Sequence, residues 1–232
     1  MFKRLSYFVT FLFIFNIAFI PNVFASCQKI LADSKLCTQI GQMVIVGFGG
    51  LRQDKQGKIY WNDPNGTVFT PNSLIAKHIA RQHVGGVILM LQPWRNAKNQ
   101  SFIRDRNIVN PQQVAKLNAD LQKYNKAIRA KQGLKSLPLF ISIDQEGGAI
   151  DRLPATLGFP VATLLPQALG AKEEVVLKKE TAIKETYVYA KKLAKEISDA
   201  NFNLNFAPTV DININPTNPI IGALGRSFSY YA

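Results

Sequence analysis

The sequence has little of what metal sites and disulfide scaffolds need: two cysteines and two histidines among 232 residues. These numbers exclude a zinc-finger array and a fold held together mainly by disulfides. The chain contains no low-complexity run, and no G-x-G-x-x-G follows an apolar segment, which argues against a dinucleotide-binding fold. Because it shows neither a cluster of metal ligands nor a phosphate loop, we expect no cofactor and no metal ion.

Hydrophobic residues make up 47% of the chain and charged residues 19%, as in a folded protein with a substantial core. The length fits one ordinary domain. Basic residues outnumber acidic ones by 28 to 15, which gives a net charge of +13. The lysines of residues 172–196 alternate with glutamates and indicate a solvated helix face, so we expect no nucleic-acid binding.

Residues 1–25 have the layout of an export signal. Lys3 and Arg4 precede an apolar run at residues 8–20, and residues 23–25 offer small side chains at both cleavage positions. The run is shorter than the about 20 apolar residues that span a bilayer. We therefore expect an exported chain, periplasmic or secreted, that meets the membrane only through its signal peptide. An uncleaved anchor is the weaker alternative.

Export would place two cysteines, Cys27 and Cys37, in an oxidising compartment where a disulfide persists. The loop between them is short, so such a bridge would pin the N-terminal segment rather than organise the core. Two unpaired thiols are the alternative. A lipoprotein anchored at Cys27 is a weaker hypothesis, because Phe24 fits poorly in a lipobox.

Apolar runs and helical periodicities alternate along the mature chain. Strands are predicted at residues 43–48, 87–91, 139–143 and 204–206. Helices are predicted around residues 74–79, 110–133 and 183–197, and a long polar loop at 50–71. This order predicts an α/β fold with a parallel sheet, either doubly wound or a (β/α)8 TIM-type barrel. Four strands make about the first half of such a barrel.

Chemistry-bearing residues follow the third and fourth strands. Asp144 comes directly after the third strand, and two glycines and Arg152 come soon after it. Asp211 and Arg226 follow the fourth strand. Function in parallel α/β folds gathers at these carboxyl ends. A carboxylate that accepts and a guanidinium that donates can bind sugar hydroxyls, although an ion-paired loop without function is the alternative.

Several segments together resemble the β-N-acetylhexosaminidases of glycoside hydrolase family 3. They are GQMVIVGF (41–48), GGVILM (85–90), IDQEGG (143–148), NLNFAPTVDININPTNP (203–219) and GRSF (225–228). The resemblance covers residues 36–230 and implies that residues 26–232 are an incomplete N-terminal (β/α)8 barrel domain. It also implies a retaining exo-glycosidase that removes terminal non-reducing N-acetylglucosamine from cell-wall or chitin-type saccharides.

By the same resemblance, Asp144, Arg152 and Arg226 match sugar-binding residues of the family. The resemblance assigns the support of this site to Glu146, Gly147, Gly148 and Asp211. The chain departs from the family at Ala149, where an arginine usually follows the glycine pair. That arginine is not the one matched to Arg152, so we expect a modest effect.

The family's Lys-His-Phe-Pro-Gly-His-Gly stretch, with its acid/base histidine, and the later nucleophilic aspartate have no match in these 232 residues. His78 and His83 match no such motif, and we expect each to be a surface histidine or one whose hydrogen bonds are satisfied within the fold. A retaining glycosidase needs a nucleophile and a proton donor. We therefore expect no catalytic residue and no turnover in this chain alone. The second hypothesis is a non-catalytic N-acetylglucosamine or peptidoglycan binder, and the net charge allows attraction to an anionic cell-wall polymer.

Overall fold

The computed structural model describes residues 35–49, 51–53, 59–61, 68–91, 107–171 and 179–229. The predicted signal peptide and Cys27 lie outside these ranges, so the signal and the disulfide from Cys27 to Cys37 stay predictions. Within the described ranges, no helix has the length and apolarity needed to cross a membrane.

Four parallel strands form the central sheet, in the spatial order β1-β4-β5-β6. They are β1 (Ile45–Gly47), β4 (Gly86–Ile88), β5 (Phe140–Ile143) and β6 (Leu204–Asn205). All four strands predicted from apolar runs are present, each shorter than its run. Because the strands are parallel, their carboxyl ends meet at one edge of the sheet.

Three helices confirm the predicted periodicities: α3 (Leu74–Arg81), α4 (Pro111–Lys131) and α6 (Lys179–Asp199). Local chemistry sets where two of them begin. The Ser73 hydroxyl accepts the backbone N–H of Ala76 at 3.2 Å, and the Asn110 side chain accepts that of Gln113 at 2.8 Å. These caps satisfy donors that have no partner inside the helix.

The predicted loop at residues 50–71 is wrong in part. It contains an antiparallel pair of strands, β2 (Leu51–Gln53) and β3 (Ile59–Trp61). The run Ile-Tyr-Trp has high strand propensity, which the surrounding polar residues obscured. Three short elements were not predicted either: α2 (Lys35–Gly41), the 3-10 turn η1 (Ala155–Leu157) and α5 (Pro166–Ala171).

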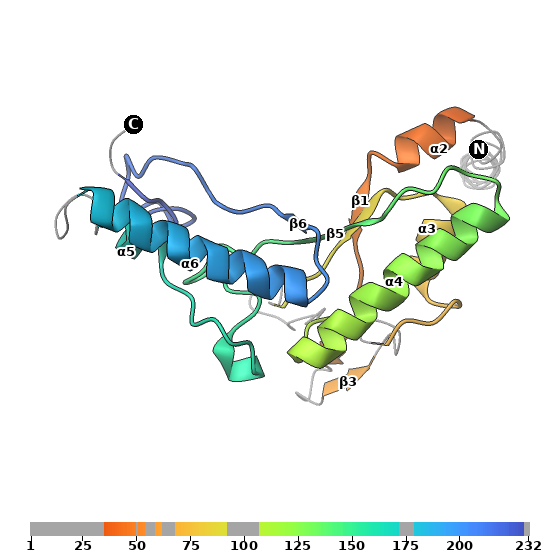
Figure 1. Cartoon of the computed structure of the whole chain (residues 1–232), viewed down its shortest axis with the longest axis horizontal. Coiled ribbons are helices and arrows are strands. Elements are labelled where there is room, and N and C mark those ends of the chain that lie inside the picture. The colour runs from red at the N-terminus through yellow and green to blue at the C-terminus, as the bar shows by residue number, and fades with distance from the viewer. Residues whose placement is uncertain are drawn as a thin grey trace, which may run out of the picture.

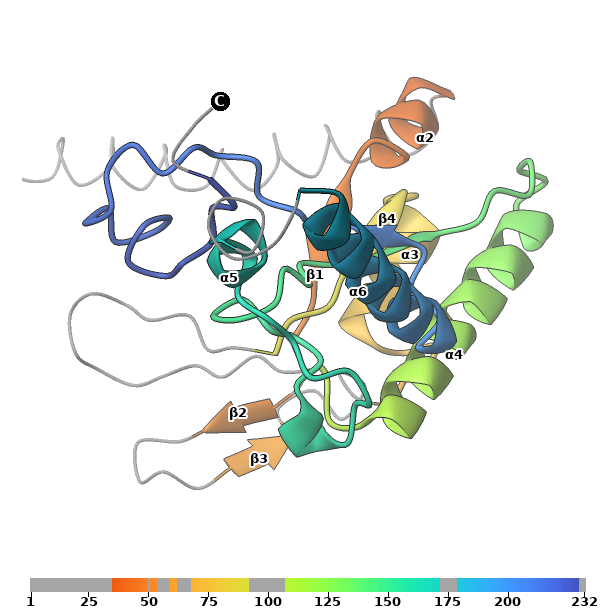
Figure 2. The ribbon, with the colours of Figure 1, turned by 60° about the vertical axis from the view of Figure 1, so that its left-hand side comes forward.

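The helices cover one face of the sheet. Figures 1 and 2 show α4 and α6 on the same side of the strands. The core between them includes Val87 and Ile141 from the sheet, Leu117 from α4 and Leu193 from α6. Side chains alternate along a strand. Phe140, next to Ile141, is accordingly 51% exposed.

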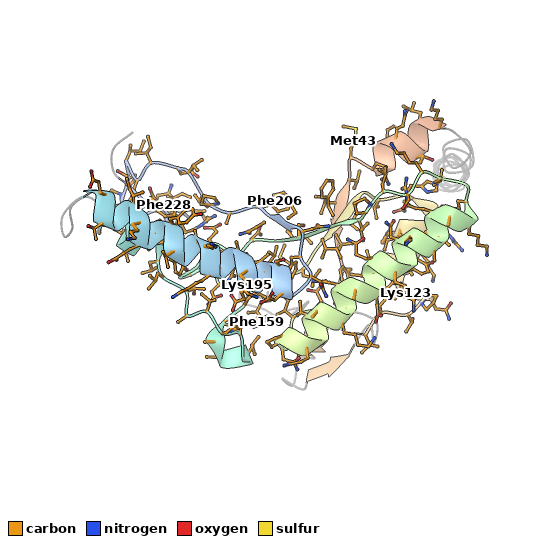
Figure 3. The ribbon with its side chains drawn as sticks, viewed as in Figure 1. Met43, Lys123, Phe159, Lys195, Phe206 and Phe228 are labelled. Atoms are coloured by element: carbon orange, nitrogen blue, oxygen red, sulfur yellow. The ribbon has the colours of Figure 1, made fainter. Side chains whose placement is uncertain are left out.

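The opposite face of the sheet is apolar and open. Figure 3 places Met43 and Phe206 on the side away from α4 and α6, and they are 85% and 52% exposed. Parallel sheets are normally covered on both faces. The described part of the chain is therefore a parallel α/β sheet with helices on one face, an arrangement that part of a TIM-type barrel would have.

Candidate functional site

The site begins where β5 ends. Asp144 is partly buried and directly follows buried Ile143. The chain then turns through Gly147 and Gly148, whose φ values are +94° and +57°. A side chain on Gly147 would overlap the carbonyl oxygen of Leu164. The glycine pair thus makes the tight turn that the sequence predicts, in a backbone conformation that glycine adopts readily.

Gln145 anchors this turn, and sequence reasoning missed it. Its side chain is fully buried. The amide oxygen accepts the backbone N–H of Arg152 at 2.6 Å and that of Leu153 at 3.3 Å. The amide nitrogen donates to Asp151 Oδ1 at 2.9 Å. A glutamine directly after a strand is usually interpreted as a solvated loop residue. In the sequence, only its position between Asp144 and Glu146 distinguishes it.

Asp151, also missed, uses both carboxylate oxygens. Oδ1 accepts from Gln145 and from the backbone N–H of Leu153 at 3.1 Å, and Oδ2 accepts from the Thr163 hydroxyl at 2.7 Å. The contact with Thr163 joins the loop after β5 to the segment before α5. The backbone N–H groups of Arg152 and Leu153 are therefore held by the side chains of Gln145 and Asp151.

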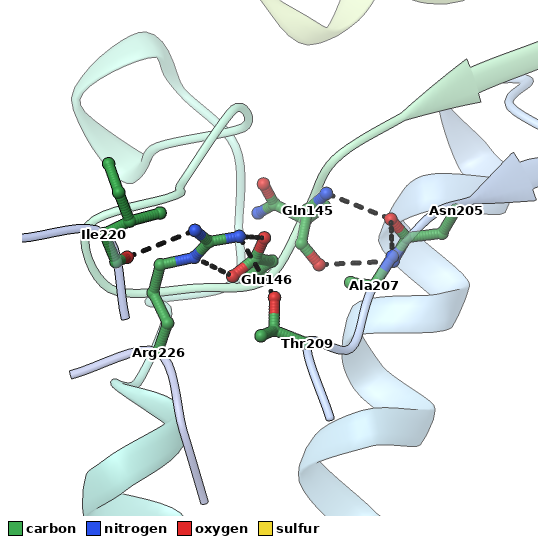
Figure 4. Close-up of polar contacts among 7 residues, drawn as sticks. All are labelled: Gln145, Glu146, Asn205, Ala207, Thr209, Ile220 and Arg226. Carbon is green, nitrogen blue, oxygen red and sulfur yellow. Dashed lines mark hydrogen bonds and ion pairs between the residues drawn. The ribbon is translucent and has the colours of Figure 1, made fainter. Parts of the chain in front are cut away.

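Asn205, at the end of β6, joins the two strand ends (Figure 4). Its side-chain oxygen accepts the backbone N–H of Gln145 at 3.0 Å, and its nitrogen donates to the Gln145 carbonyl at 3.2 Å. The same oxygen accepts the N–H of Ala207 at 3.3 Å. One amide side chain thus continues the parallel pairing beyond the last ladder residues.

Arg226 crosses from the segment after β6 to the loop after β5. Its Nε and Nη2 donate to the two oxygens of Glu146 at 2.8 and 2.7 Å, a bidentate pair (Figure 4). Nη2 also donates to the Thr209 hydroxyl at 3.1 Å, and Nη1 donates to the Ile220 carbonyl at 3.2 Å. The hydrogen bonds that Glu146 accepts from Arg226 raise the pKa of Arg226 above its ordinary value.

Arg152 lies in the same electrostatic cluster but is held differently. Its Nε is buried and has no hydrogen-bond partner among the residues described. Burial lowers the pKa of its guanidinium, while the nearby carboxylates of Asp144 and Glu146 raise it and the charge of Arg226 lowers it. The charge of Asp144 also raises the pKa of Arg226. The structure thus brings together the three residues predicted to bind a ligand.

Asp211 contacts the segment of Arg226 through its backbone and acts on Arg226 through its charge. Its carbonyl oxygen accepts the Ser227 hydroxyl at 2.6 Å, next to Arg226 in the sequence. Its exposed carboxylate also raises the pKa of Arg226. The predicted role as site support is consistent with this placement and stays a prediction.

The two histidines lie elsewhere. His78 is in α3, and His83 precedes β4, at the edge of the sheet opposite the carboxyl ends. Burial, with a smaller effect of Arg129, lowers the pKa of His83. Among the described residues, no group of three or more His, Cys, Asp or Glu side chains could hold a metal ion.

The parallel sheet and the polar loops at its strand ends define an α/β domain whose candidate site lies at the carboxyl ends of the strands. Residues 35–231 match the family described as the glycosyl hydrolase family 3 N terminal domain. This chain belongs to that family, which is a family of glycosidases.

Known proteins similar to the chain agree with this assignment. β-Hexosaminidase A of Pseudoalteromonas piscicida is 34% identical over 159 residues, which cover 67% of this chain and 21% of that protein. The chain thus spans about a fifth of the relative's length.

Two solved structures are also similar to it. A fungal multi-domain GH3 β-N-acetylglucosaminidase is 27% identical, with a TM-score of 0.49, and the match covers 83% of this chain and 17% of that one. A β-N-acetylhexosaminidase from Beutenbergia cavernae is 24% identical, with a TM-score of 0.46, covering 86% and 46%.

Proposed function

We propose that this chain carries the sugar-binding part of a β-N-acetylhexosaminidase site for terminal, non-reducing N-acetylglucosamine. The name of the curated relative, β-hexosaminidase A, supports this substrate class. In this chain, Asp144 accepts hydrogen bonds from sugar hydroxyls and Arg152 donates to them. Arg226, cross-linked to Glu146, holds the floor of the site.

The observation that carries the proposal is the unpartnered Nε of Arg152, buried in the cluster that contains Asp144. A buried donor left without a partner costs about 1–3 kcal/mol. If the side chain turns toward a ligand, a hydroxyl that accepts from this nitrogen and donates to the neighbouring carboxylate removes that cost. An ion-paired loop that binds no ligand would explain Arg226, because its three side-chain nitrogens all have partners. It would not explain Arg152, because its Nε has no partner among the described residues.

The chemistry of the family is retaining hydrolysis, in which a carboxylate attacks the anomeric carbon while an acid protonates the leaving oxygen, and water then releases the sugar. The residues described here bind and orient the sugar for such a step. Glu146 is engaged with Arg226 through both oxygens and is not free to act as the nucleophile. We therefore expect binding but no turnover from these 232 residues.

Calorimetry with N-acetylglucosamine tests the binding. We expect saturable binding by the full chain, weakened at least about tenfold in Asp144→Ala, which is the effect of losing one charged hydrogen bond. Asp199→Ala is the matched control, because this carboxylate lies on the exposed face of α6 and pairs with Lys195. No binding at millimolar sugar would overturn the proposal. Appreciable hydrolysis of an aryl N-acetyl-β-glucosaminide would contradict the absence of turnover.

We also propose that residues 1–25 direct export and are then removed. The support is the sequence layout alone: a basic start, an apolar run and small residues before Ser26. Mass spectrometry of the chain secreted from an expressing bacterium should give a mature N-terminus at Ser26. An intact N-terminus at Met1 would contradict cleavage.

A further inference from the structure

Arg152 is placed by its backbone, because its side chain lacks an anchor at Nε. Nε has no hydrogen-bond partner among the described residues, and the charges around the guanidinium oppose one another, since Asp144 and Glu146 attract it while Arg226 repels it. By contrast, the backbone N–H of Arg152 makes a short hydrogen bond of 2.6 Å to the buried amide oxygen of Gln145. The direction in which the Arg152 side chain leaves the backbone therefore depends on Gln145.

A glutamine amide can present either its oxygen or its nitrogen to a neighbour. Only the oxygen can accept the N–H of Arg152. Asp151 selects that orientation, because its Oδ1 accepts from the Gln145 amide nitrogen at 2.9 Å. If the amide turned over, its nitrogen would face the N–H of Arg152 and its oxygen would face a carboxylate. Both contacts would be repulsive.

Thr163 in turn orients the Asp151 carboxylate, donating to Oδ2 at 2.7 Å. The segment that carries Thr163 is tied to α6 on both sides. The backbone N–H of Val161 donates to Glu196 at 2.8 Å, and that of Leu164 donates to the Tyr189 hydroxyl at 3.0 Å. These hydrogen bonds, together with the backbone of residues 161–164, therefore connect a long helix to the backbone of Arg152.

We propose that Thr163, Asp151 and Gln145 are positioning residues that hold Arg152 in its ligand-binding orientation. The inference deepens the proposed function and rests on it for the identity of the ligand. None of the three needs to touch the sugar. Their effect on binding passes through the guanidinium of Arg152, and this separates them from residues that merely stabilise the fold.

The test uses the Nε–H resonance of Arg152 in NMR spectra of the full chain, assigned by its loss in Arg152→Lys. We expect Thr163→Val, which removes the hydroxyl at nearly constant shape, to shift this resonance and raise its mobility. It should also weaken N-acetylglucosamine binding about tenfold. Thr163→Ser keeps the donor and should restore both. Thr156→Val is the matched control, since Thr156 is exposed in η1.

A second pair of variants provides the test in case the Thr163→Val protein does not fold. Asp151→Asn keeps an acceptor for Gln145, and its new amide can donate to the Thr163 hydroxyl, so the resonance should stay near its wild-type position. Asp151→Ala should shift it as Thr163→Val does. If the wild type binds no sugar, the proposed function fails, but the resonance still decides the positioning role. An unchanged resonance in both Thr163→Val and Asp151→Ala overturns the inference.

Discussion

The two loops that follow β5 and β6 hold their arginines in opposite ways. Arg226 makes hydrogen bonds through all three of its nitrogens, and its pKa is raised. Arg152 has a buried Nε with no partner among the described residues, and burial lowers its pKa. The backbone N–H of Arg152, and not its guanidinium, donates the hydrogen bond that ties this residue to the surrounding loop.

This difference gives Arg152 and Arg226 separate roles, although their positions in the sequence are similar. Each arginine lies in the segment that follows a strand, Arg152 after β5 and Arg226 after β6, and the family resemblance assigns both to one sugar site. In the structure, Arg226 cross-links two loops through Glu146. Arg152 has a buried Nε–H without a partner among the described residues, and this lowers the stability of the fold. Stability and ligand binding should therefore respond differently to changes at the two positions.

The largest expected effect comes from breaking the turn that carries Arg152. Gly147→Ala combines a φ of +94° with overlap on the Leu164 carbonyl, and should lower the free energy of unfolding by more than about 3 kcal/mol. Gly133→Ala is the matched control: its φ is +66°, with open space around it. It should lose only about 1–2 kcal/mol. Chemical denaturation measures both, and equal losses would contradict the steric argument.

Removing the cross-link should have the next largest effect. Glu146 and Arg226 are 8% and 18% exposed, so Glu146→Gln should lower the free energy of unfolding by about 2 kcal/mol. The exposed pair of Lys195 and Asp199 gives the comparison, and Asp199→Asn should change it by less than about 0.5 kcal/mol. Urea unfolding at two salt concentrations checks the difference. A loss as small as that of the exposed pair would show that Arg226 is not structural.

The contrast sharpens when each arginine is replaced by methionine. Arg226→Met should destabilise the chain by about 2 kcal/mol, because it leaves Glu146 buried and unpaired. Arg152→Met should leave the free energy of unfolding unchanged or higher, since it removes an unpartnered buried donor. It should still weaken N-acetylglucosamine binding about tenfold. Equal destabilisation by the two variants would remove the distinction between them.

The smallest effect concerns the anchor on α6. Glu196 is buried, and burial raises its pKa above the ordinary value of 4.5, against the opposing hydrogen bond from Val161. The folded state therefore binds this proton more tightly than the unfolded state, so its contribution to stability falls as pH rises from about 4.5 through the raised pKa. Glu196→Gln should flatten that part of a pH–stability profile. Unchanged curvature would exclude Glu196 as its source.

Much of the fold was predictable from local sequence patterns. Three strands of the sheet, β1, β4 and β5, lie in mainly apolar segments, and α4 begins at an asparagine followed by proline. The pair of strands between residues 51 and 61 was missed because short strands in a polar stretch carry little periodicity. The short helices α2 and α5 are too brief for a helical pattern to stand out.

The site was predictable in part. Asp144, Arg152 and Arg226 were singled out by their places after strands and by resemblance, and the structure brings them into one cluster. Gln145 and Asp151 were not, because their importance lies in contacts with backbone groups and with Thr163. Such contacts leave no periodic signal in the sequence.

The sequence by itself determined the α/β class, the order of the strands along the chain and the turn at the glycine pair. These depend on hydrophobic periodicity and on backbone freedom, which are local properties. Only the tertiary structure decided that Arg226 pairs with Glu146, 80 residues away, while Arg152 keeps an unpartnered nitrogen. Parallel pairing of β5 with β6 brings those distant loops to one edge of the sheet, and burial there sets which polar groups find partners.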